Sequence, residues 1–254
     1  MTNSTRVSRI VSREVADCQT CHLRALCVPQ GLPLKDIAEL NGIAPPLAPL
    51  KKHDALFRQG MPFTSLFAVR SGSLKQVTTT YTNEHLVTGF FLPGDLVGLD
   101  AIAEECYPGS AVALETTTVC ELPFERLNEL SLRIPALRQR IYRDLSQEVH
   151  NERLMQRLLL NRTAEARLAR FLLTMSASFR RRGYSPYRFQ LAMTRGDIGN
   201  YLGLSLETVS RTLTRYQQHE LVVIRGHDFH LCDMKALTRL SEACGRQGAA
   251  QQPS

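Results

Sequence analysis

The chain has 254 residues, of which 43% are hydrophobic and 22% are charged, so it can form one large or two ordinary globular domains. Its formal net charge of +7 favours a polyanionic partner. No run approaches the roughly 18 apolar residues of a membrane span, and the first residues lack the apolar core of a signal peptide, so we expect a cytoplasmic protein without a membrane part.

Three cysteines lie close together near the N-terminus. After a polar stretch, residues 1–16, which we expect to be loosely ordered, Cys18, Cys21 and Cys27 follow at C-x-x-C-x-x-x-x-x-C spacing. An odd total of seven cysteines, without an export signal, favours reduced thiols, metal ligation or redox chemistry over a disulfide scaffold. Thiolates this close can converge on one metal centre. An iron–sulfur cluster and a zinc ion both take four thiolates, and the spacing does not separate them.

Short alternating strands are expected from about residue 51 to residue 123. They follow a proline-rich connector, residues 28–50, with one short helix at Leu34–Leu40. Even spacing with Gly, Pro and Asn turns predicts a β-sandwich, jelly roll or small barrel. The expected strands are 55–57, 65–69, 74–77, 85–92, 111–114 and 117–122. Cys120 lies in the last of these, where a single cysteine is by itself more typical of a small buried residue than of a ligand.

A long helical region follows Pro123. Pro135 suits the first turn of its principal helix, and apolar residues recur at helical spacing for about six turns, at Leu137, Ile141, Leu145, Met155 and Leu159. A helix of this length usually packs on a partner helix, which predicts a homodimer seam that includes Ile141, Leu145, Glu152 and Met155. Glu148 and Glu152 interrupt the stripe, and each would meet its own copy in a symmetric dimer, which weakens association. The alternative is a solvated stretch.

A second amphipathic helix is expected at Asn161–Phe179. It ends at Arg180-Arg181-Arg182-Gly183, a run that either contacts DNA phosphates or is a solvated helix end. A strand-like segment, Phe189–Met193, leads into the next motif, and the tail after about Ala243 is expected to be disordered.

The stretch from Thr194 to Gln217 indicates a helix-turn-helix. Thr194 can cap the first helix together with Asp197, and Gly203 can end it in a left-handed conformation. Ser205 can cap the second helix, whose apolar face is Val209, Leu213 and Tyr216. The polar residues near the start of this second helix lie off its apolar face, a pattern that is typical of a recognition helix in the major groove.

Base contacts are available from three of these residues. Arg211 can bind a guanine through two hydrogen bonds, Glu207 can accept from a cytosine amine, and Ser210 is adaptable. The alternative without a DNA-binding function is an ordinary αα-hairpin with a solvated polar face. Two apolar runs, 221–224 and 229–231, flank residues 225–228 and predict a two-stranded wing, which favours DNA binding.

Taken together, these motifs resemble the CRP/FNR superfamily of bacterial transcription regulators, and within it the oxygen-sensing FNR/Anr branch. The resemblance spans about Cys18 to Cys232. Its markers are the cysteine string and the segments FAVRSG (67–72), TGF (88–90), PGDLVG (93–98), ALETT (113–117), VCELPFE (119–125), GNYLGL (199–204) and ETVSR (207–211).

The resemblance implies an α+β fold with five parts. These are a cysteine-rich segment and connector (1–50), a cyclic-nucleotide-binding-like β-roll (51–124), a dimerisation helix region (125–160), a winged helix-turn-helix (161–243) and a tail (244–254).

It also implies a [4Fe-4S] cluster on Cys18, Cys21, Cys27 and Cys120, which overrides the local interpretation of Cys120. Glu207, Ser210 and Arg211 match the family's base-reading residues, for operators resembling TTGAT-N4-ATCAA. Glu152 matches an acidic position of the dimer seam. RNA polymerase contacts are implied around Thr80–Glu84 and Ser71-Gly72-Ser73.

Three other functions share parts of this pattern. A cyclic-nucleotide receptor needs an arginine in its phosphate cassette, and the matching stretch, 107–111 (YPGSA), has none, so we expect no cyclic nucleotide. A zinc- or thiol-based redox regulator remains open. A metal-dependent β-roll enzyme would need clustered His and carboxylate ligands, whereas His53 and His85 are isolated, so we expect no enzyme. Cys106, Cys232 and Cys244 fit no cluster.

Overall fold

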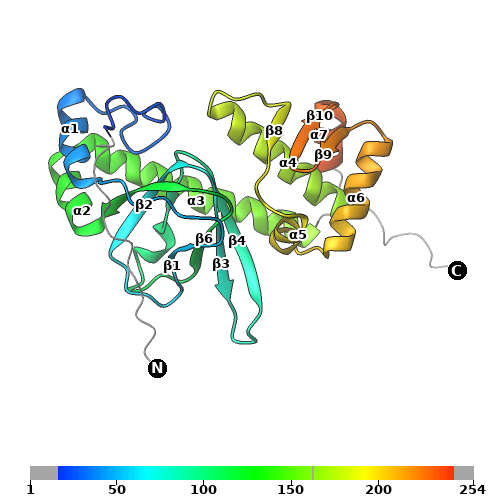
Figure 1. Cartoon of the computed structure of the whole chain (residues 1–254), viewed down its shortest axis with the longest axis horizontal. Helices are drawn as coiled ribbons and strands as arrows, with labels where there is room; N and C mark the ends of the chain where they lie inside the picture. The colour runs from blue at the N-terminus through cyan, green and yellow to red at the C-terminus, as the bar shows by residue number, and fades with distance from the viewer. Residues whose placement is uncertain (1–16, 162, 243–254) are drawn as a thin grey trace, which may run out of the picture. The chain divides into compact units, whose positions relative to one another are not determined.

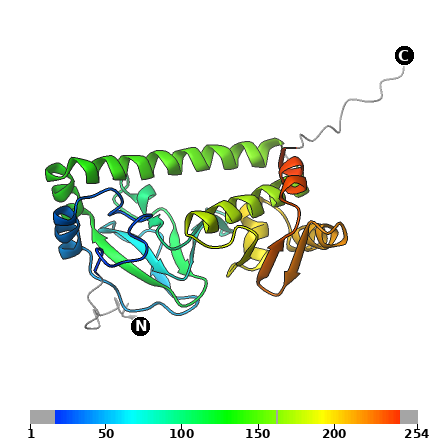
Figure 2. The same ribbon diagram turned by 90° about the horizontal axis from the view of Figure 1, so that it is seen from above.

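The computed structural model describes residues 17–161 and 163–242. The expected loose order of residues 1–16 and the expected disordered tail from residue 244 lie outside the described residues. The chain divides into two compact units, residues 1–148 and 149–254, and the boundary falls within the long helix α3 (Pro135–Asn161) (Figures 1 and 2). None of the helices in the described part is both long and apolar enough to span a bilayer.

The first unit contains a β-roll made of two antiparallel sheets. One sheet has the order β1-β6-β3-β4 and the other β5-β2-β7. Six of the seven strands were predicted; the seventh, β5, has two residues and is too short to give an alternating pattern. The bounds are β1 Ala55–Phe57, β2 Ser65–Ser71, β3 Leu74–Thr79, β4 His85–Phe91, β5 Leu96–Val97, β6 Ser110–Ala113 and β7 Thr118–Pro123, with a 3-10 turn, η1, at Leu99–Ala101.

Strand β2 is buried on both faces. Successive side chains of a strand point to opposite sides, so β2 contributes to two different cores. Phe67 and Val69 enter a core between the two sheets, where strands of both sheets contribute apolar side chains. Leu66 and Ala68 enter a second core on the other face. The sandwich-like prediction is therefore confirmed, with an additional core outside the roll.

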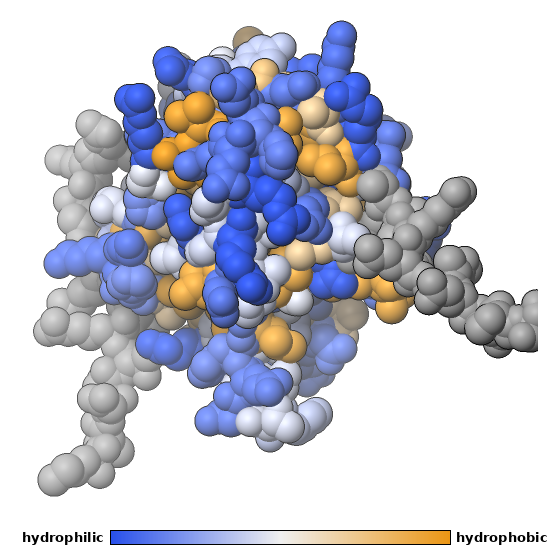
Figure 3. Space-filling view, turned by 90° about the vertical axis from the view of Figure 1, so that its right-hand side faces the viewer, coloured by the Kyte–Doolittle hydropathy of each residue, from blue (hydrophilic) through white to orange (hydrophobic). Residues whose placement is uncertain are grey.

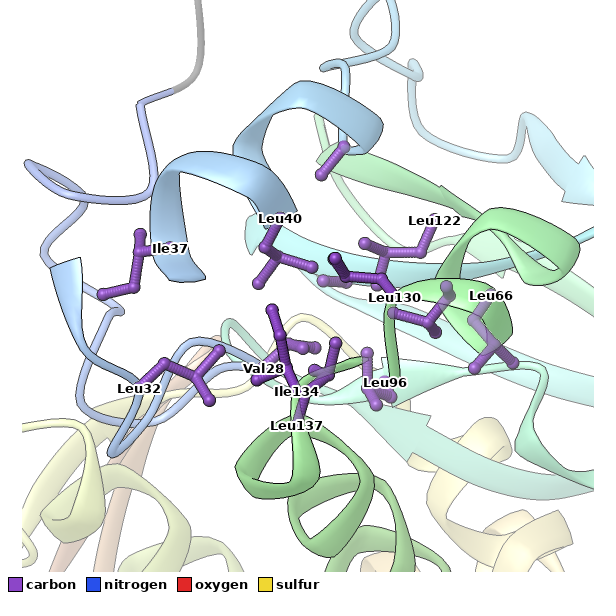
Figure 4. Packing of buried hydrophobic residues seen from close by; sticks show 13 residues of the cluster. Val28, Leu32, Ile37, Leu40, Leu66, Leu96, Leu122, Leu130, Ile134 and Leu137 are labelled. Carbon is purple, nitrogen blue, oxygen red and sulfur yellow. The ribbon is translucent and has the colours of Figure 1, made fainter. Parts of the chain in front are cut away.

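Helices cover that second core. Helix α1 (Leu34–Ile43), helix α2 (Phe124–Arg133) and the first turn of α3 bring Ile37, Leu40, Leu130 and Leu137 onto the sheet (Figure 4). Leu137 is completely buried, so the first turn of α3 is part of the core of the first unit. Within the helical region expected at 125–160, the principal helix begins at Pro135 as predicted, and α2 precedes it, because Ile134 is extended before Pro135 and the ring of Pro135 suits a helix start.

The described part of the second unit, residues 149–161 and 163–242, contains four further helices and a three-stranded sheet. The helices are α4 (Ala164–Arg181), α5 (Arg195–Leu202), α6 (Leu206–Gln218) and α7 (Met234–Glu242), and the strands are β8 (Arg188–Gln190), β9 (Val222–Arg225) and β10 (Asp228–Leu231). The second helix begins at Ala164 and not at Asn161, because the Thr163 side chain caps it by accepting from the Ala166 N–H.

The predicted two-stranded wing is present as the antiparallel pair β9–β10, and a third strand, β8, which overlaps the strand-like segment expected at Phe189–Met193, joins it. Strand β8 pairs with β10, in the sheet order β8-β10-β9, and the ring of Phe189 on β8 stacks parallel to that of Phe229 on β10. The partner strands lie far apart in the sequence, so no local turn signal reveals the pairing.

Candidate cysteine pocket and nucleic-acid interface

The N-terminal cysteines lie on tight turns that are anchored to the first unit. The N–H of Cys27 donates to the Leu23 carbonyl at 2.9 Å, and the Leu23 side chain is buried. The N–H of Cys18 donates to the Asn41 side chain of α1 at 3.1 Å. The turns therefore present their thiols from fixed points on the core.

Strand β7 presents Cys120 toward the same core. Val119 faces the core between the sheets, so its neighbour Cys120 faces the other core, where Cys18 and Cys27 also pack. The proline-rich connector runs antiparallel to this strand: the Leu47 N–H donates to the Val119 carbonyl at 3.0 Å, and Pro46 pairs with Cys120. The connector thus forms part of the structure around Cys120.

All four predicted ligands line one pocket. Cys18, Cys21, Cys27 and Cys120 border it together with apolar side chains and the guanidinium-bearing residues Arg24 and Arg70. Each of the four thiols is free and half-buried. The two other cysteines within the described residues, Cys106 and Cys232, are exposed and lie outside the pocket, and Cys244 lies outside the described residues.

The arrangement of the donors bears on what they can hold. Within residues 17–161 and 163–242, no group of three or more His, Cys, Asp or Glu side chains is placed to hold a single metal ion. A zinc site needs four sulfurs at about 2.3 Å from one ion. In a four-iron cluster each thiolate binds a different iron, so the sulfurs surround a larger body. Four thiols around an apolar pocket fit that donor set.

The pocket disfavours free thiolates. Burial raises the pKa of Cys18 to about 11, with a further contribution from the neighbouring thiols of Cys120 and Cys21. Burial raises the pKa of Cys27 to about 12, and it also raises that of Cys120. The guanidinium of Arg70 opposes these increases at Cys18 and Cys120. A metal centre would therefore displace thiol protons, and Arg70 would stabilise the negative charge that results.

Sequence reasoning did not single out Arg70. It follows Val69 on β2, the strand that pairs with β7 beside Cys120, so its neighbourhood to the thiols is set by the sheet register. Within the sequence it belongs to the FAVRSG segment, which marked the family without indicating a role for its arginine.

The helix-turn-helix forms as predicted. The Thr194 hydroxyl accepts from the Asp197 N–H at 3.0 Å, and the Asp197 carboxylate accepts from the Thr194 N–H at 3.0 Å, a reciprocal cap. Gly203 ends α5 with φ of 62°, and the Ser205 hydroxyl caps α6 by accepting from the Thr208 N–H at 3.1 Å. The turn between the helices is thus determined by local side chains.

Gly199 allows the two helices to approach. A Cβ atom at this position would lie 2.7 Å from the Leu204 carbonyl oxygen and 3.3 Å from a methyl group of Val209. A side chain larger than hydrogen therefore forces α5 and α6 apart.

Helix α6 is fixed to helix α4 through Glu165. The hydroxyl of Tyr216 donates to the Glu165 carbonyl at 2.5 Å, and the Arg215 guanidinium pairs with the Glu165 carboxylate. Val209 and Leu213 are buried beneath α6. These contacts leave the opposite face of α6 for a partner.

That opposite face carries the predicted base-reading residues. The side chains of Arg211 and Glu207 are 69% and 78% exposed and form a loose i,i+4 ion pair at 3.8 Å. Arg195, at the start of α5, donates to the Ser210 hydroxyl at 3.5 Å, and it is a further cation here that the sequence prediction missed. Figure 3, which shows the side of the molecule on which α6 is labelled in Figure 1, has a mainly hydrophilic surface with small hydrophobic patches.

The predicted dimer seam lies on α3. Ile141 is half-buried and packs partly against the core of the first unit. Leu145 and Met155 are half-buried, and Glu152 is exposed. Tyr142 and Val149 on α3, which sequence reasoning missed, are 62% and 49% exposed.

Comparison with known proteins agrees with this architecture. Residues 47–133 match the cyclic nucleotide-binding domain family, and residues 166–240 match the Crp-like helix-turn-helix domain family. Among solved structures, FixK2 from Bradyrhizobium japonicum is 25% identical with a TM-score of 0.73, covering 79% of this chain and 98% of that one.

Curated relatives are much closer in sequence. The transcriptional activator protein Anr of Pseudomonas aeruginosa is 50% identical over 89% of this chain and 93% of its own length. The fumarate and nitrate reduction regulatory protein of Escherichia coli is 43% identical over 88% of this chain and 90% of its own length. These relatives are transcription regulators and not enzymes. The chain therefore belongs to the CRP/FNR superfamily of DNA-binding transcription regulators, in its FNR/Anr branch of anaerobic regulators.

Proposed function

We propose that this regulator responds to oxygen through a [4Fe-4S] cluster held by Cys18, Cys21, Cys27 and Cys120, and that it controls anaerobic gene expression as a cluster-dependent homodimer. The observation that carries the proposal is the pocket itself: four free thiols from two distant segments border one apolar space. When bound there, such a cluster supplies a centre that oxygen degrades.

The chain's own residues would convert cluster binding into a mechanical constraint. Four thiolates on one group join the turns at 18–27 to strand β7, in addition to the side-chain packing and the connector that already link them. The apolar lining limits the access of water, and Arg70 offsets part of the negative charge of the thiolates.

Dimerisation would use α3. The apolar side chains of Tyr142 and Val149 are exposed on this helix, and Leu145 and Met155 are half-buried there. Glu152 is exposed, and in a symmetric dimer its carboxylate would face its own copy, which weakens association and makes the dimer depend on the cluster.

The dimer would bind palindromes resembling TTGAT-N4-ATCAA. Two recognition helices related by symmetry suit half-sites about one helical turn apart. Glu207, Ser210 and Arg211 would contact base edges, and Arg195 would support Ser210.

RNA polymerase is the second proposed partner. The turn at Thr80–Glu84 is closed by the Thr80 N–H donating to the Glu84 carbonyl at 2.9 Å, and it presents a fully exposed Tyr81. A cyclic nucleotide is not proposed, because the stretch 107–111 contains no arginine and the Ser110 hydroxyl accepts from the Gln59 N–H at 2.9 Å.

The test is to purify the chain without oxygen, count iron and acid-labile sulfide, and follow visible absorbance and operator binding while air is admitted. About four irons and four sulfides per chain, with colour and binding lost together, are expected. A colourless protein that holds zinc would contradict the cluster, and it would make the four cysteines a structural or thiol-redox site.

A further inference from the structure

One arginine of α3 reaches the cysteine turn. The Arg140 guanidinium donates through one Nη atom to the carbonyl of Leu26 at 2.8 Å, and Leu26 directly precedes Cys27. Its Nε donates to the Asp144 carboxylate at 2.9 Å, one helical turn further along α3. A single side chain therefore connects the backbone beside a proposed cluster ligand to the proposed dimerisation helix.

This contact is built into the fold and is not a loose surface pair. The side chains of Arg140 and Asp144 are 11% and 19% exposed, whereas those of the Arg211–Glu207 pair are 69% and 78% exposed. Burial raises the pKa of Asp144, and the adjacent Arg140 opposes that rise. A charge-assisted hydrogen bond at a site of this exposure is weakly screened, so its geometry is well maintained.

The Leu26 side chain has a second close neighbour in the turn at 93–95. Gly94, in the turn between β4 and β5, has φ of 94°, and a Cβ atom there would lie 3.1 Å from the Cβ of Leu26. The turn at 93–95 therefore packs close to the Leu26 side chain, while the Arg140 guanidinium binds the Leu26 carbonyl, so this residue is held through both its side chain and its backbone.

We infer that Arg140 is a positioning residue through which the state of the cysteine pocket acts on α3. The inference rests on the proposed function. When the Cys27 thiolate is one of the four bound ligands, the position of the Leu26 carbonyl is fixed and holds the Arg140 guanidinium. Arg140 in turn holds Asp144 and the start of α3. When the turn is released, this hydrogen bond is lost and α3 is freed from the pocket at that point.

The test measures coupling. Sedimentation gives the dimer dissociation constant of the full chain, anaerobically, with the cluster loaded and after its removal by chelation, and the ratio of the two constants is the coupling. We expect Arg140→Gln to lower this ratio about tenfold, the effect of losing a hydrogen bond to a charged group, with iron and sulfide content unchanged. A role confined to stability would change both constants alike and leave the ratio intact.

Arg143→Gln is the matched control. It removes the same charge from the same helix, near Asp144, but its side chain is exposed. Its ratio should equal that of the unmodified chain. An unchanged ratio in a fully loaded Arg140→Gln variant would overturn the inference.

A second variant covers the case in which Arg140→Gln does not load. Asp144→Asn keeps the arginine and its bond to Leu26 but weakens the attachment to α3, and it should lower the ratio by a smaller factor; no change in that variant would also overturn the inference. If the unmodified chain itself showed no cluster or a ratio of one, the proposed function would fail instead.

Discussion

The cysteine pocket and the helix-turn-helix differ in how their residues are brought together. The helix-turn-helix is one continuous stretch, and its caps at Thr194, Gly203 and Ser205 bond to residues within a few positions. The pocket joins the turns at 18–27 to Cys120 through strand register, connector and core. The first region is therefore sensitive to local substitutions, and the second depends on contacts across its whole unit.

The sharpest way to separate the two regions is Cys120→Ser. We expect iron to fall from about four to below one per chain and cluster-dependent operator binding to weaken at least about a hundredfold, because a cuboidal cluster needs its fourth thiolate. Metal analysis and gel-shift titration without oxygen measure both. Cys232→Ser, at an exposed cysteine of the other unit, is the control and should keep both properties. Full iron content in the Cys120 variant would refute its role as a ligand.

Arg211→Ala should weaken operator binding without loss of iron. Operator affinity should fall about 10- to 100-fold, since a two-bond contact to guanine is lost, while iron content stays normal. Arg239→Ala removes an equal charge from an exposed position on α7 and should change affinity little. Fluorescence anisotropy at fixed salt gives both affinities. Equal losses in the two variants would show that Arg211 contributes charge alone.

Gly199→Ala tests how tightly the local motif is packed. The added methyl group would collide with the Leu204 carbonyl, so we expect about 1–3 kcal/mol lower stability in denaturant unfolding. Gly196→Ala on the same helix meets nothing closer than 3.6 Å, and it should raise stability by roughly 0.5 kcal/mol. We therefore expect the two variants to change the free energy of unfolding in opposite directions. A change in the same direction in both variants would mean that the two helices can move apart freely.

Arg70→Gln should have the smallest effect. Removing this cation from the edge of the pocket should speed the loss of visible absorbance in air by about threefold, because a half-exposed charge is partly screened. Arg58→Gln, at an exposed position of the same unit, should leave the rate unchanged. The same rate of absorbance loss in both variants would show that Arg70 does not stabilise the pocket.

Some features of the molecule follow from the sequence alone. Caps, glycines and apolar periodicity lie within one or two helical turns of the residues they act on, so the helix-turn-helix and most β-roll strands could be predicted with bounds close to those observed. The cysteine spacing likewise predicted a metal or redox site from Cys18, Cys21 and Cys27.

Other features were decided by the tertiary structure. The alternation of β7 places Cys120 opposite Val119 and beside the N-terminal turns. Strand β8 pairs with β10 although α5, α6 and β9 lie between them in the chain, and Ile141 packs partly on the core of the first unit. Arg70 and Arg140 meet the cysteine segment only because a strand and a helix from elsewhere in the chain pack against it. Such contacts depend on register and packing between distant segments, and hydrophobic patterning within one segment carries no information about them.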